Sequence, residues 1–306
     1  MTVRVVYRSY GGENAKGRPP YYSKALALQA TLRAVQEANV EILFINNGPI
    51  PEHLVSVMRH HGEIVTLPDV GMRRSFLTGL RLPNRRGWDA DDVVYFCEDD
   101  YLHVPEAFVR LSAAARELDA SYFALYGPLL DDEEPGTPVW DLQKIDSSVV
   151  YPRGFSPRPP VEAGGWHWKR ILSTTSTFGA RVGALRADVP IFWQSGLPHR
   201  KMYRDYDMCV TYQGFEAYRW GELGRELVLR GNGTLLERGR RAALVPFKAA
   251  MNLRSHRRPH HRHKLVCAAP NLATHLEAAF IAPGRDWAAL AAETSDWAAT
   301  ALPAQH

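Results

Sequence analysis

The chain has 306 residues, of which 45% are hydrophobic, so it can bury a full core in one large domain or two closely packed ones. Lys and Arg exceed Asp and Glu by only four and the signs are interspersed, so we expect no nucleic-acid partner. Cys97, Cys209 and Cys267 are widely spaced among apolar residues, which indicates reduced, packed thiols. With no signal-like start and no apolar run of membrane-spanning length, a cytoplasmic protein is expected.

Strands and helices alternate through the first half of the chain. The predicted strands are 3–9, 40–45, 63–67 and 92–97. The predicted helices begin after Ser23, at Pro51, near residue 72 and at Pro105. This alternation predicts an α/β fold with a mostly parallel sheet and helices on both faces. In such sheets, ligands bind at the carboxyl ends of the strands.

Three carboxylates, Glu98, Asp99 and Asp100, directly follow the fourth predicted strand. They repel one another, and a strand end above a sheet is partly desolvated, so the cluster is costly unless a cation compensates it. Mg²⁺ and Mn²⁺ prefer such oxygen ligands together with phosphates and water, which indicates a diphosphate-metal site. The alternative is a solvated turn that caps the helix beginning near Pro105, because acidic residues also favour helix N-termini.

Four segments of the first half follow one another in an informative order. They are VVYRSYGGEN, LFINNG with Asn46 and Asn47, GMRRSFLTG from Gly71 to Gly79, and VVYFCEDDYLHVPEAF. The ordered set resembles the nucleotide-sugar-binding half of GT-A-fold glycosyltransferases, most closely the inverting family 2. That family has an Asn in the third segment where this chain has Leu77, which is a departure from the pattern.

The resemblance implies that residues 1–130 form a nucleotide-sugar-binding half. Residues 131–306 would form an acceptor-binding half with a C-terminal lid and helix, within one intimate GT-A unit. The implied donor-binding residues are Arg8, Ser9, Asn46, Arg73, Glu98 and Asp99. The implied metal ligands are Asp100, Glu98 and, from the C-terminal part, His275. Lys16 and Arg18 are candidate neighbours of the phosphates.

The segment RDYDM, residues 204–208, resembles the acidic motif that supplies the catalytic base of family 2 enzymes, with Arg204 in place of the usual Glu. On this resemblance, Asp205 takes the proton from the attacking hydroxyl. Arg204 would lower the pKa of Asp205 and weaken it as a base. Helix capping by Asp205 or Asp207 is the alternative. A retaining enzyme would not need Asp205 in this role, so the stereochemical outcome stays open.

Two further segments of the second half have more than one interpretation. Trp166 and Trp168 could form an apolar platform for a sugar or could pack in the core. The basic, His-rich segment 252–264 could be a solvated loop, a lid over the donor diphosphate or a patch for anionic lipid head groups.

Together, the residues and the resemblance predict a metal-dependent glycosyltransferase that uses Mn²⁺ or Mg²⁺. The implied reaction moves a sugar, with inversion, from a nucleoside diphosphate sugar, with a UDP-sugar favoured. The acceptor would be a hydroxyl or amine of a small molecule, a glycan or a lipid-linked compound. The alternatives are a sugar nucleotidyltransferase and a non-catalytic nucleotide- or carbohydrate-binding module. A peripheral contact with a membrane also stays open.

Overall fold

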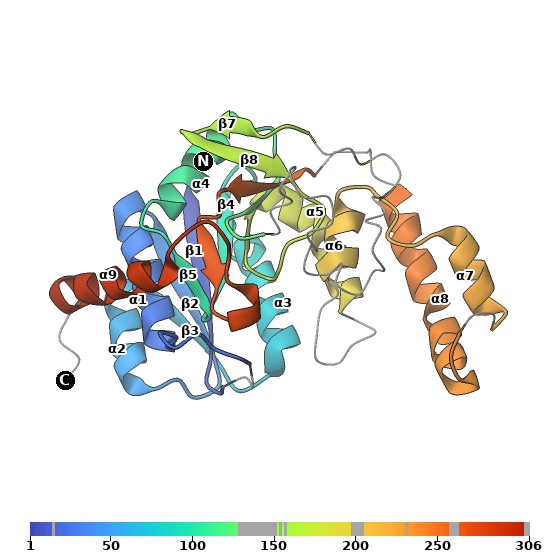
Figure 1. The fold of residues 1–306 in the computed structure, drawn as a ribbon, viewed down its shortest axis with the longest axis horizontal. Coiled ribbons are helices and arrows are strands. Elements are labelled where there is room, and N and C mark those ends of the chain that lie inside the picture. The colour runs from blue at the N-terminus through green and yellow to red at the C-terminus, as the bar shows by residue number, and fades with distance from the viewer. Residues whose placement is uncertain are drawn as a thin grey trace.

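A computed structural model describes residues 1–13, 16–127, 152, 155, 158–196, 205–229, 232–256 and 263–302. Its centre is a nine-stranded sheet in the order β3-β2-β1-β4-β9-β6-β10-β8-β7 (Figure 1). The strands are β1 (Val3–Tyr10), β2 (Glu41–Asn47), β3 (Glu63–Leu67), β4 (Val93–Glu98), β6 (Tyr122–Ala124), β7 (Val161–Ala163), β8 (Trp166–Arg170), β9 (Phe178–Arg181) and β10 (Leu265–Ala269). A separate two-stranded sheet pairs β5 (Tyr101–His103) with β11 (Ala273–His275).

Most strands of the large sheet run in one direction. The strands β1, β2, β3 and β4 pair in parallel, as do β6 and β10. In the described part of the chain, every antiparallel pairing of this sheet involves β8 or β9. The predicted α/β class with a mostly parallel sheet is confirmed, and the inserted antiparallel strand β9 joins its two parallel parts.

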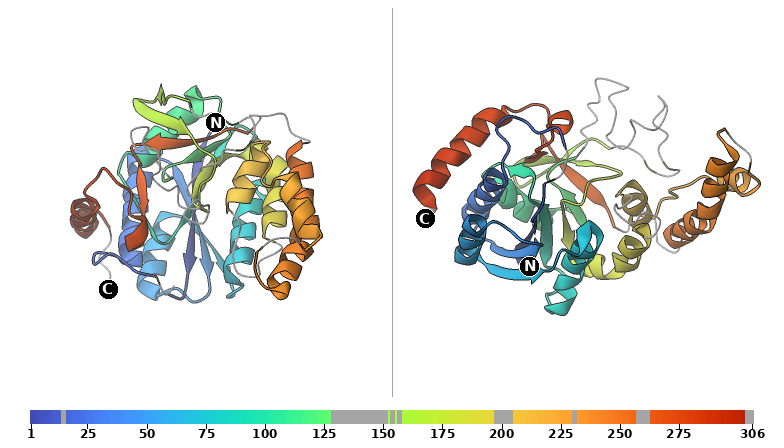
Figure 2. Two further views of the ribbon diagram at one scale, coloured as in Figure 1. Left: turned by 45° about the vertical axis from the view of Figure 1, so that its right-hand side comes forward. Right: turned by 90° about the horizontal axis from the view of Figure 1, so that it is seen from below.

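The helices cover both faces of the sheet, as predicted. The helices of the described residues are α1 (Lys24–Ala38), α2 (Glu52–His61), α3 (Gly71–Arg85), α4 (Ala107–Glu117), α5 (Val182–Ser195), α6 (Asp205–Tyr212), α7 (Trp220–Leu227), α8 (Leu235–His256) and α9 (Trp287–Ala301). Of these, α7 and α8 stand away from the sheet, and α8 packs against α5 and α6. Figure 2 shows helices on both sides of the sheet. One hydrophobic core lies between the sheet and α1, α2, α4 and α9. A second lies between the sheet and α3, α5 and α6, and Met251 near the end of α8 joins it.

Local sequence explains how these elements begin. The hydroxyl of Ser23 accepts a hydrogen bond from the N–H of Leu26 at 3.0 Å, so the predicted N-cap of the first helix is confirmed. Strand β1 is buried on both faces, with Val5 in one core and Val6 in the other. Strands buried on both faces read as apolar runs, as VVY in β1 and VVYFC in β4 do, whereas β3 has no buried residue.

The C-terminal part of the chain returns to the first half. Strand β10 lies between β6 and β8, β11 pairs with β5, and α9 packs against α1. Strands from both sides of residue 130 therefore share one sheet, and the roles assigned to the two halves stay a prediction.

Two predictions from composition can be compared with the structure. All three cysteines are buried and free, which confirms the prediction of packed thiols. Among the described residues, no helix combines the length and the apolar character that crossing a bilayer would need.

Candidate functional site

The carboxyl ends of β2, β1 and β4 lie side by side at one edge of the sheet. Ser9 on β1 pairs with Asn46 on β2, and Arg8 on β1 pairs with Glu98 on β4. Because side chains alternate along a strand, Arg8 and Glu98 face the α3 side while Ser9 and Asn46 face the α1 side. Four of the residues predicted to bind the donor therefore meet at this edge.

Glu98 and Asp99 each have a basic partner within the chain. The carboxylate of Glu98 forms a salt bridge with Arg8. The carboxylate of Asp99 accepts a hydrogen bond from the N–H of Tyr10 at 2.9 Å and lies 3.2 Å from the ammonium of Lys24. Burial raises the pKa of Asp99 above its usual value, although the charge of Lys24 acts in the opposite direction.

Asp100 is the most strongly paired of the three acids. Its Oδ2 atom lies 3.1 Å from the Nζ of Lys16, 3.2 Å from the guanidinium of Arg18 and 3.1 Å from the Nε2 of His275. The side chain is only 7% exposed. Burial alone raises the pKa of Asp100, but the hydrogen bond and charge of His275 and the charge of Lys16 outweigh it and hold the pKa below its usual value.

These contacts correct two parts of the sequence interpretation. The acidic triplet 98–100 does not cap the following helix, because Asp100 is buried and the N-cap of α4 is Glu106, without a side-chain hydrogen bond. The electrostatic cost of the triplet is met by Arg, Lys and His side chains, so charge compensation alone does not require a metal ion.

His275 reaches Asp100 through the small sheet. In the pairing of β11 with β5, His275 lies opposite Tyr101, the residue that follows Asp100. The imidazole ring is 4.9 Å from the ring of Tyr101 and stacks at 6.1 Å on Phe280. Two residues separated by 175 positions, both predicted from the sequence as metal ligands, are thereby brought into direct contact.

The loop after β1 and the chain after β11 interlock over Asp100. The guanidinium of Arg18 donates a hydrogen bond to the carbonyl of Leu276 at 2.7 Å, and the N–H of Ala278 donates to the carbonyl of Gly17 at 2.8 Å. Lys16 also lies 3.6 Å from the carboxylate of Glu277. The predicted phosphate neighbours Lys16 and Arg18 are therefore held beside the acidic strand end.

The two asparagines at the end of β2 differ in role. Asn47 Oδ1 accepts a hydrogen bond from the N–H of Val70 at 3.0 Å, which fixes the turn before α3. Asn46 is buried, and its Oδ1 atom accepts no hydrogen bond from the part of the chain that the structure describes. A buried polar atom without a partner is costly, so Asn46 is equipped to bind a ligand donor at this edge.

The predicted Gly-led helix is α3. Gly71 opens it with a φ of +75°, a conformation that favours glycine. Gly79 faces the sheet, where an added Cβ would contact Ile45 and Phe96. Leu77, where the family has Asn, is buried in the core on this side of the sheet. Arg73, a predicted donor-binding residue, lies half-buried in the first turn of the helix.

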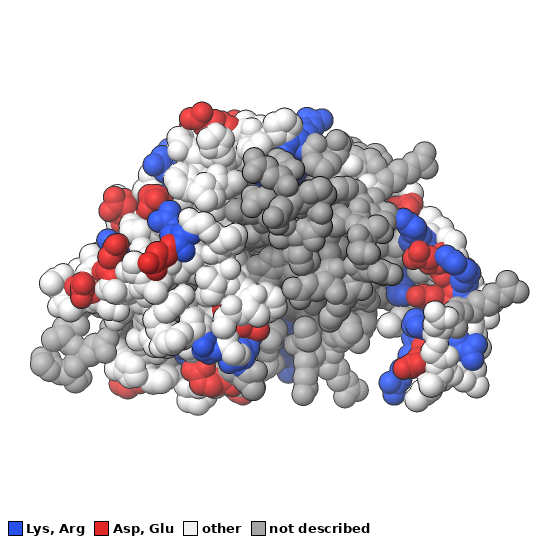
Figure 3. Space-filling model, in the orientation of Figure 1, with Lys and Arg blue, Asp and Glu red and all other residues white. Residues whose placement is uncertain are grey.

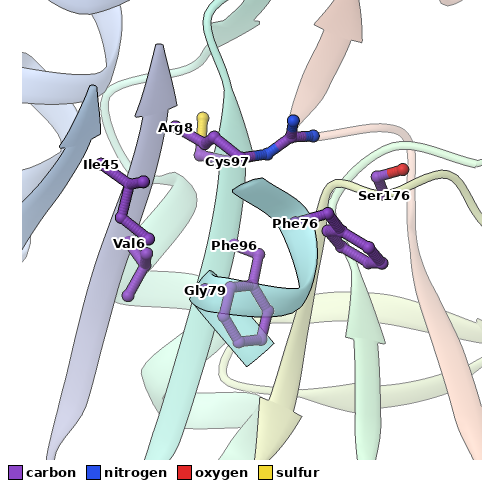
Figure 4. A pocket seen from close by; sticks show the side chains of 8 residues that line it. All are labelled: Val6, Arg8, Ile45, Phe76, Gly79, Phe96, Cys97 and Ser176. Atoms are coloured by element: carbon purple, nitrogen blue, oxygen red, sulfur yellow. The ribbon is translucent and has the colours of Figure 1, made fainter. Parts of the chain in front are cut away.

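A small, largely apolar pocket lies between α3 and the sheet (Figure 4). It is lined by Val6, Arg8, Ile45, Phe76, Gly79, Phe96, Cys97 and Ser176. The guanidinium of Arg8 lies over the ring of Phe76, 5.6 Å from its centroid, and donates to the hydroxyl of Ser75 at 3.3 Å. Arg8 is therefore fixed by both α3 and β4.

At one place, the side-chain oxygen and nitrogen atoms are of the kinds that bind a divalent cation. The carboxylate of Asp100 and the imidazole of His275 converge on the Nζ of Lys16, which lies 3.1 Å and 3.2 Å from them. The ammonium of Lys16 thus already occupies the point that these two predicted metal ligands share. Glu98, the third predicted ligand, pairs with Arg8 instead. Among the described residues, no three His, Cys, Asp or Glu side chains are arranged as a metal cage, so phosphate oxygens and water would have to complete the site.

The predicted base lies at the start of α6. Asp205 is its first residue and is half-buried, whereas Arg204 lies outside the described residues. Asp207 is buried and accepts a hydrogen bond from the hydroxyl of Tyr218. Asp207 is therefore engaged in packing α6 against the segment before α7.

Segment 173–177 links α6 to the acidic strand end. The hydroxyl of Thr177 accepts a hydrogen bond from the N–H of Glu98 at 3.3 Å. On its other side, the thiol of Cys209 on α6 contacts the carbonyl of Thr174 at 3.8 Å. Segment 173–177 therefore lies between the helix that begins at Asp205 and the end of β4, and contacts both.

Sequence reasoning missed three residues of this site. Lys24, the first residue of α1, pairs with Asp99. Its position in the sequence, shortly after the loop that follows β1, is a local signal that could have indicated this role. Glu277 and Thr177 have no local signal, because long-range pairing alone brings them to the acidic strand end. Glu277 lies 3.7 Å from the Nδ1 of His275, on the ring edge opposite Asp100.

Two other interpretations of the second half are settled in part. Trp168 is fully buried and packs against Phe123, so it cannot form a sugar platform. Trp166 is half-buried on the same strand. Residues 252–256 end α8, residues 257–262 lie outside the described part, and His263 is buried, 2.6 Å from Asp188. This last contact excludes His263 from a solvated loop.

Comparison with known proteins finds no matching family model and no matching curated protein. The fold is similar to that of S. aureus TarS, with a TM-score of 0.37 and 12% identity over 61% of this chain and 30% of that chain. A TarS 1–349 structure in complex with UDP-GlcNAc gives the same values over 47% of that chain. A nucleotidyl transferase from Methanothermobacter thermautotroptrophicus has a TM-score of 0.35 and 14% identity, covering 68% and 90% of the two chains. This chain thus spans less than a third of TarS.

Proposed function

We propose that this protein is a glycosyltransferase that binds a nucleoside diphosphate sugar at the carboxyl edge of β2, β1 and β4. The observation that carries the proposal is the convergence of Asp100 and His275 beside Lys16 and Arg18, close to the end of the parallel strands. This edge is where an α/β sheet binds its ligands. Paired acids and bases suit a diphosphate that brings both negative charge and a metal ion.

In this proposal, Asp100 and His275 hold Mn²⁺ or Mg²⁺. When bound, the metal stabilises the charge that develops on the departing diphosphate. Arg18 and Lys16 add positive charge on the loop that follows β1, and Arg8 adds it on the α3 side of the edge. These side chains orient the diphosphate. Glu98 keeps Arg8 in place through a salt bridge, and Asp99 does the same for Lys24.

The base and ribose of the donor would lie toward the end of β2. The Oδ1 of Asn46 has no hydrogen-bond partner among the described residues, so it can accept a hydrogen bond from the N–H of a uracil ring or from a ribose hydroxyl. Ser9 lies opposite Asn46 on the same side of the sheet. We therefore favour a UDP-sugar.

Asp205 is the base of the proposed reaction and takes the proton of the acceptor hydroxyl or amine. Its place at the first position of α6 stabilises the carboxylate, because helix N-termini favour negative charge. Attack from the side of α6 while the diphosphate leaves toward β4 gives inversion. In the same proposal, the acceptor is a small molecule, a glycan or a lipid-linked compound. The proposed location is the cytoplasm.

This function is tested by calorimetric titration of nucleoside diphosphate sugars into the protein, with UDP-GlcNAc as the first probe. Each titration is done in the presence and in the absence of Mn²⁺. Asp100→Asn should weaken Mn²⁺-dependent binding at least about tenfold, because a buried charged hydrogen-bonding group is lost. Asp205→Asn should keep donor affinity and lose turnover. Asp119→Asn, the same change at an exposed carboxylate far from the site, is the control. If no sugar nucleotide binds with metal dependence, the proposal fails.

A nucleotidyltransferase is the second candidate. It is favoured by the loop after β1, whose Lys16 and Arg18 both donate hydrogen bonds to Asp100. Such an enzyme joins a nucleoside triphosphate to a sugar phosphate and releases pyrophosphate. Product analysis separates the two enzymes, since a glycosyltransferase releases the nucleoside diphosphate. Sugar-nucleotide binding without either product would instead indicate a binding module.

A further inference from the structure

A helical hairpin of α7 and α8 projects from the body of the protein (Figures 1 and 2). Its helices are joined by a salt bridge of 2.6 Å between Glu226 and Lys248. At its base, the side-chain amide of Asn252 donates to the carbonyl of Tyr218 at 2.6 Å and accepts from the N–H of the same residue at 3.1 Å. The hairpin is therefore a fixed projection, and at its far end lie the last residues of α7, Val228, Leu229 and the first residues of α8.

Large apolar side chains among the described residues of this far end are exposed. Its large apolar side chains and their exposed fractions are Leu227 61%, Val228 61%, Leu229 39%, Leu235 67% and Leu236 65%. Soluble proteins rarely leave several large aliphatic side chains together in water, and such clusters mark contacts with a partner or a membrane. We call these five residues the hairpin tip.

Positive charge concentrates on the same element. Residues 219–256 contain eight Lys or Arg against three Asp or Glu, a formal net charge of +5, whereas the whole chain carries +4. The rest of the protein is therefore close to neutral, with one more acidic than basic residue. Both signs are visible along the hairpin in Figure 3.

The three acids of the hairpin are engaged by the hairpin itself. Glu226 pairs with Lys248, Glu222 lies 3.9 Å from Arg219, and Glu237 accepts a hydrogen bond from the N–H of Thr234 at 2.8 Å. The exposed basic residues Arg225 and Arg240 flank the tip on α7 and α8. The hairpin therefore combines exposed apolar side chains with a net positive charge.

We propose that the hairpin tip docks on an anionic lipid bilayer. Leu and Val side chains enter the interface, and flanking arginines contact the phosphates of the head groups, as in interfacial amphipathic helices. A second copy of the chain fits less well, because two tips of net positive charge repel each other. A nucleic acid would leave the leucines in water. This surface differs from segment 252–264, which the sequence suggested, and does not depend on the proposed reaction.

Vesicle flotation tests the inference with the full chain. The protein should bind mixed phosphatidylcholine and phosphatidylglycerol vesicles, bind phosphatidylcholine alone more weakly, and lose binding as salt rises. Leu235→Ser with Leu236→Ser should reduce binding about tenfold or more, because two largely exposed leucines no longer enter the bilayer. Leu253→Ser is the matched control, since Leu253 lies on α8 away from the tip and is 54% exposed. Arg240→Gln should weaken binding to anionic vesicles only.

Several outcomes would overturn the inference. One is a wild-type protein that does not bind anionic vesicles, and another is equal binding by the tip and control variants. A third is a dimer, detected by sedimentation, that the tip substitutions dissociate, while the wild-type protein does not bind vesicles. Sugar-nucleotide titration of the same variants distinguishes failure of membrane docking from failure of the proposed glycosyltransferase function. The tip variant should bind the sugar nucleotide as the wild-type protein does, whether or not it binds vesicles.

Discussion

At the scale of single residues, the site is a set of paired charges. Asp100 touches three basic groups and Asp99 one lysine, and this difference explains why the pKa of Asp100 is lowered while that of Asp99 is raised. Lys16 is the central residue, because its ammonium contacts both Asp100 and His275. A divalent ion that used these two ligands would have to displace it.

Replacement of Lys16 therefore tests the metal site directly. Lys16→Met should tighten Mn²⁺ binding to the nucleotide-free protein by about fivefold to tenfold, because a competing cation worth roughly 1 kcal/mol is removed. Calorimetry or the electron paramagnetic resonance signal of free Mn²⁺ measures this. Lys264→Met, which removes an ammonium paired with the exposed Asp119, is the control. Unchanged or weaker Mn²⁺ binding in Lys16→Met would show that Asp100 and His275 are not metal ligands.

At the scale of elements, the loop after β1 positions the basic residues. Gly11 lets this loop approach the chain after β2, since a Cβ on Gly11 would lie 2.3 Å from the carbonyl oxygen of Pro49. The N–H of Gly11 also donates to the carbonyl of Asn47 at 3.0 Å. This close backbone contact therefore holds the start of the loop that also carries Lys16 and Arg18 against the chain after β2.

Two glycines of this loop provide a matched comparison. Gly11→Ala should lower the free energy of unfolding by about 1–3 kcal/mol and weaken donor binding, because the backbone must move away from Pro49. Gly17→Ala places its methyl group where no atom lies within 4 Å and should cost little. Urea denaturation and nucleotide titration measure both effects. Similar stability of the two variants would contradict this account of the loop.

At the scale of the whole molecule, the C-terminal part of the chain completes the first half. The strand β10 lies inside the shared sheet, β11 delivers His275 to Asp100, and α9 covers α1. Neither core is therefore built from one half of the sequence alone.

Unfolding should accordingly be one transition. Far-ultraviolet circular dichroism and tryptophan fluorescence should give the same midpoint in urea, because tryptophans of the second half and helices of the first half share one core. Two separated transitions would indicate that the halves before and after residue 130 fold independently.

The sequence by itself determined the α/β class, the first-half strands and helices, the Ser23 cap and the position of three acids at a strand end. These features depend on apolar periodicity and local hydrogen bonds, which neighbouring residues encode. The tertiary structure alone decided which cation pairs with which acid. It also brought His275 to Asp100, placed Glu277 and Thr177 nearby, and inserted β9 antiparallel in the sheet. Those contacts join residues far apart in the chain, and strand pairing and packing, rather than any local pattern, determine them.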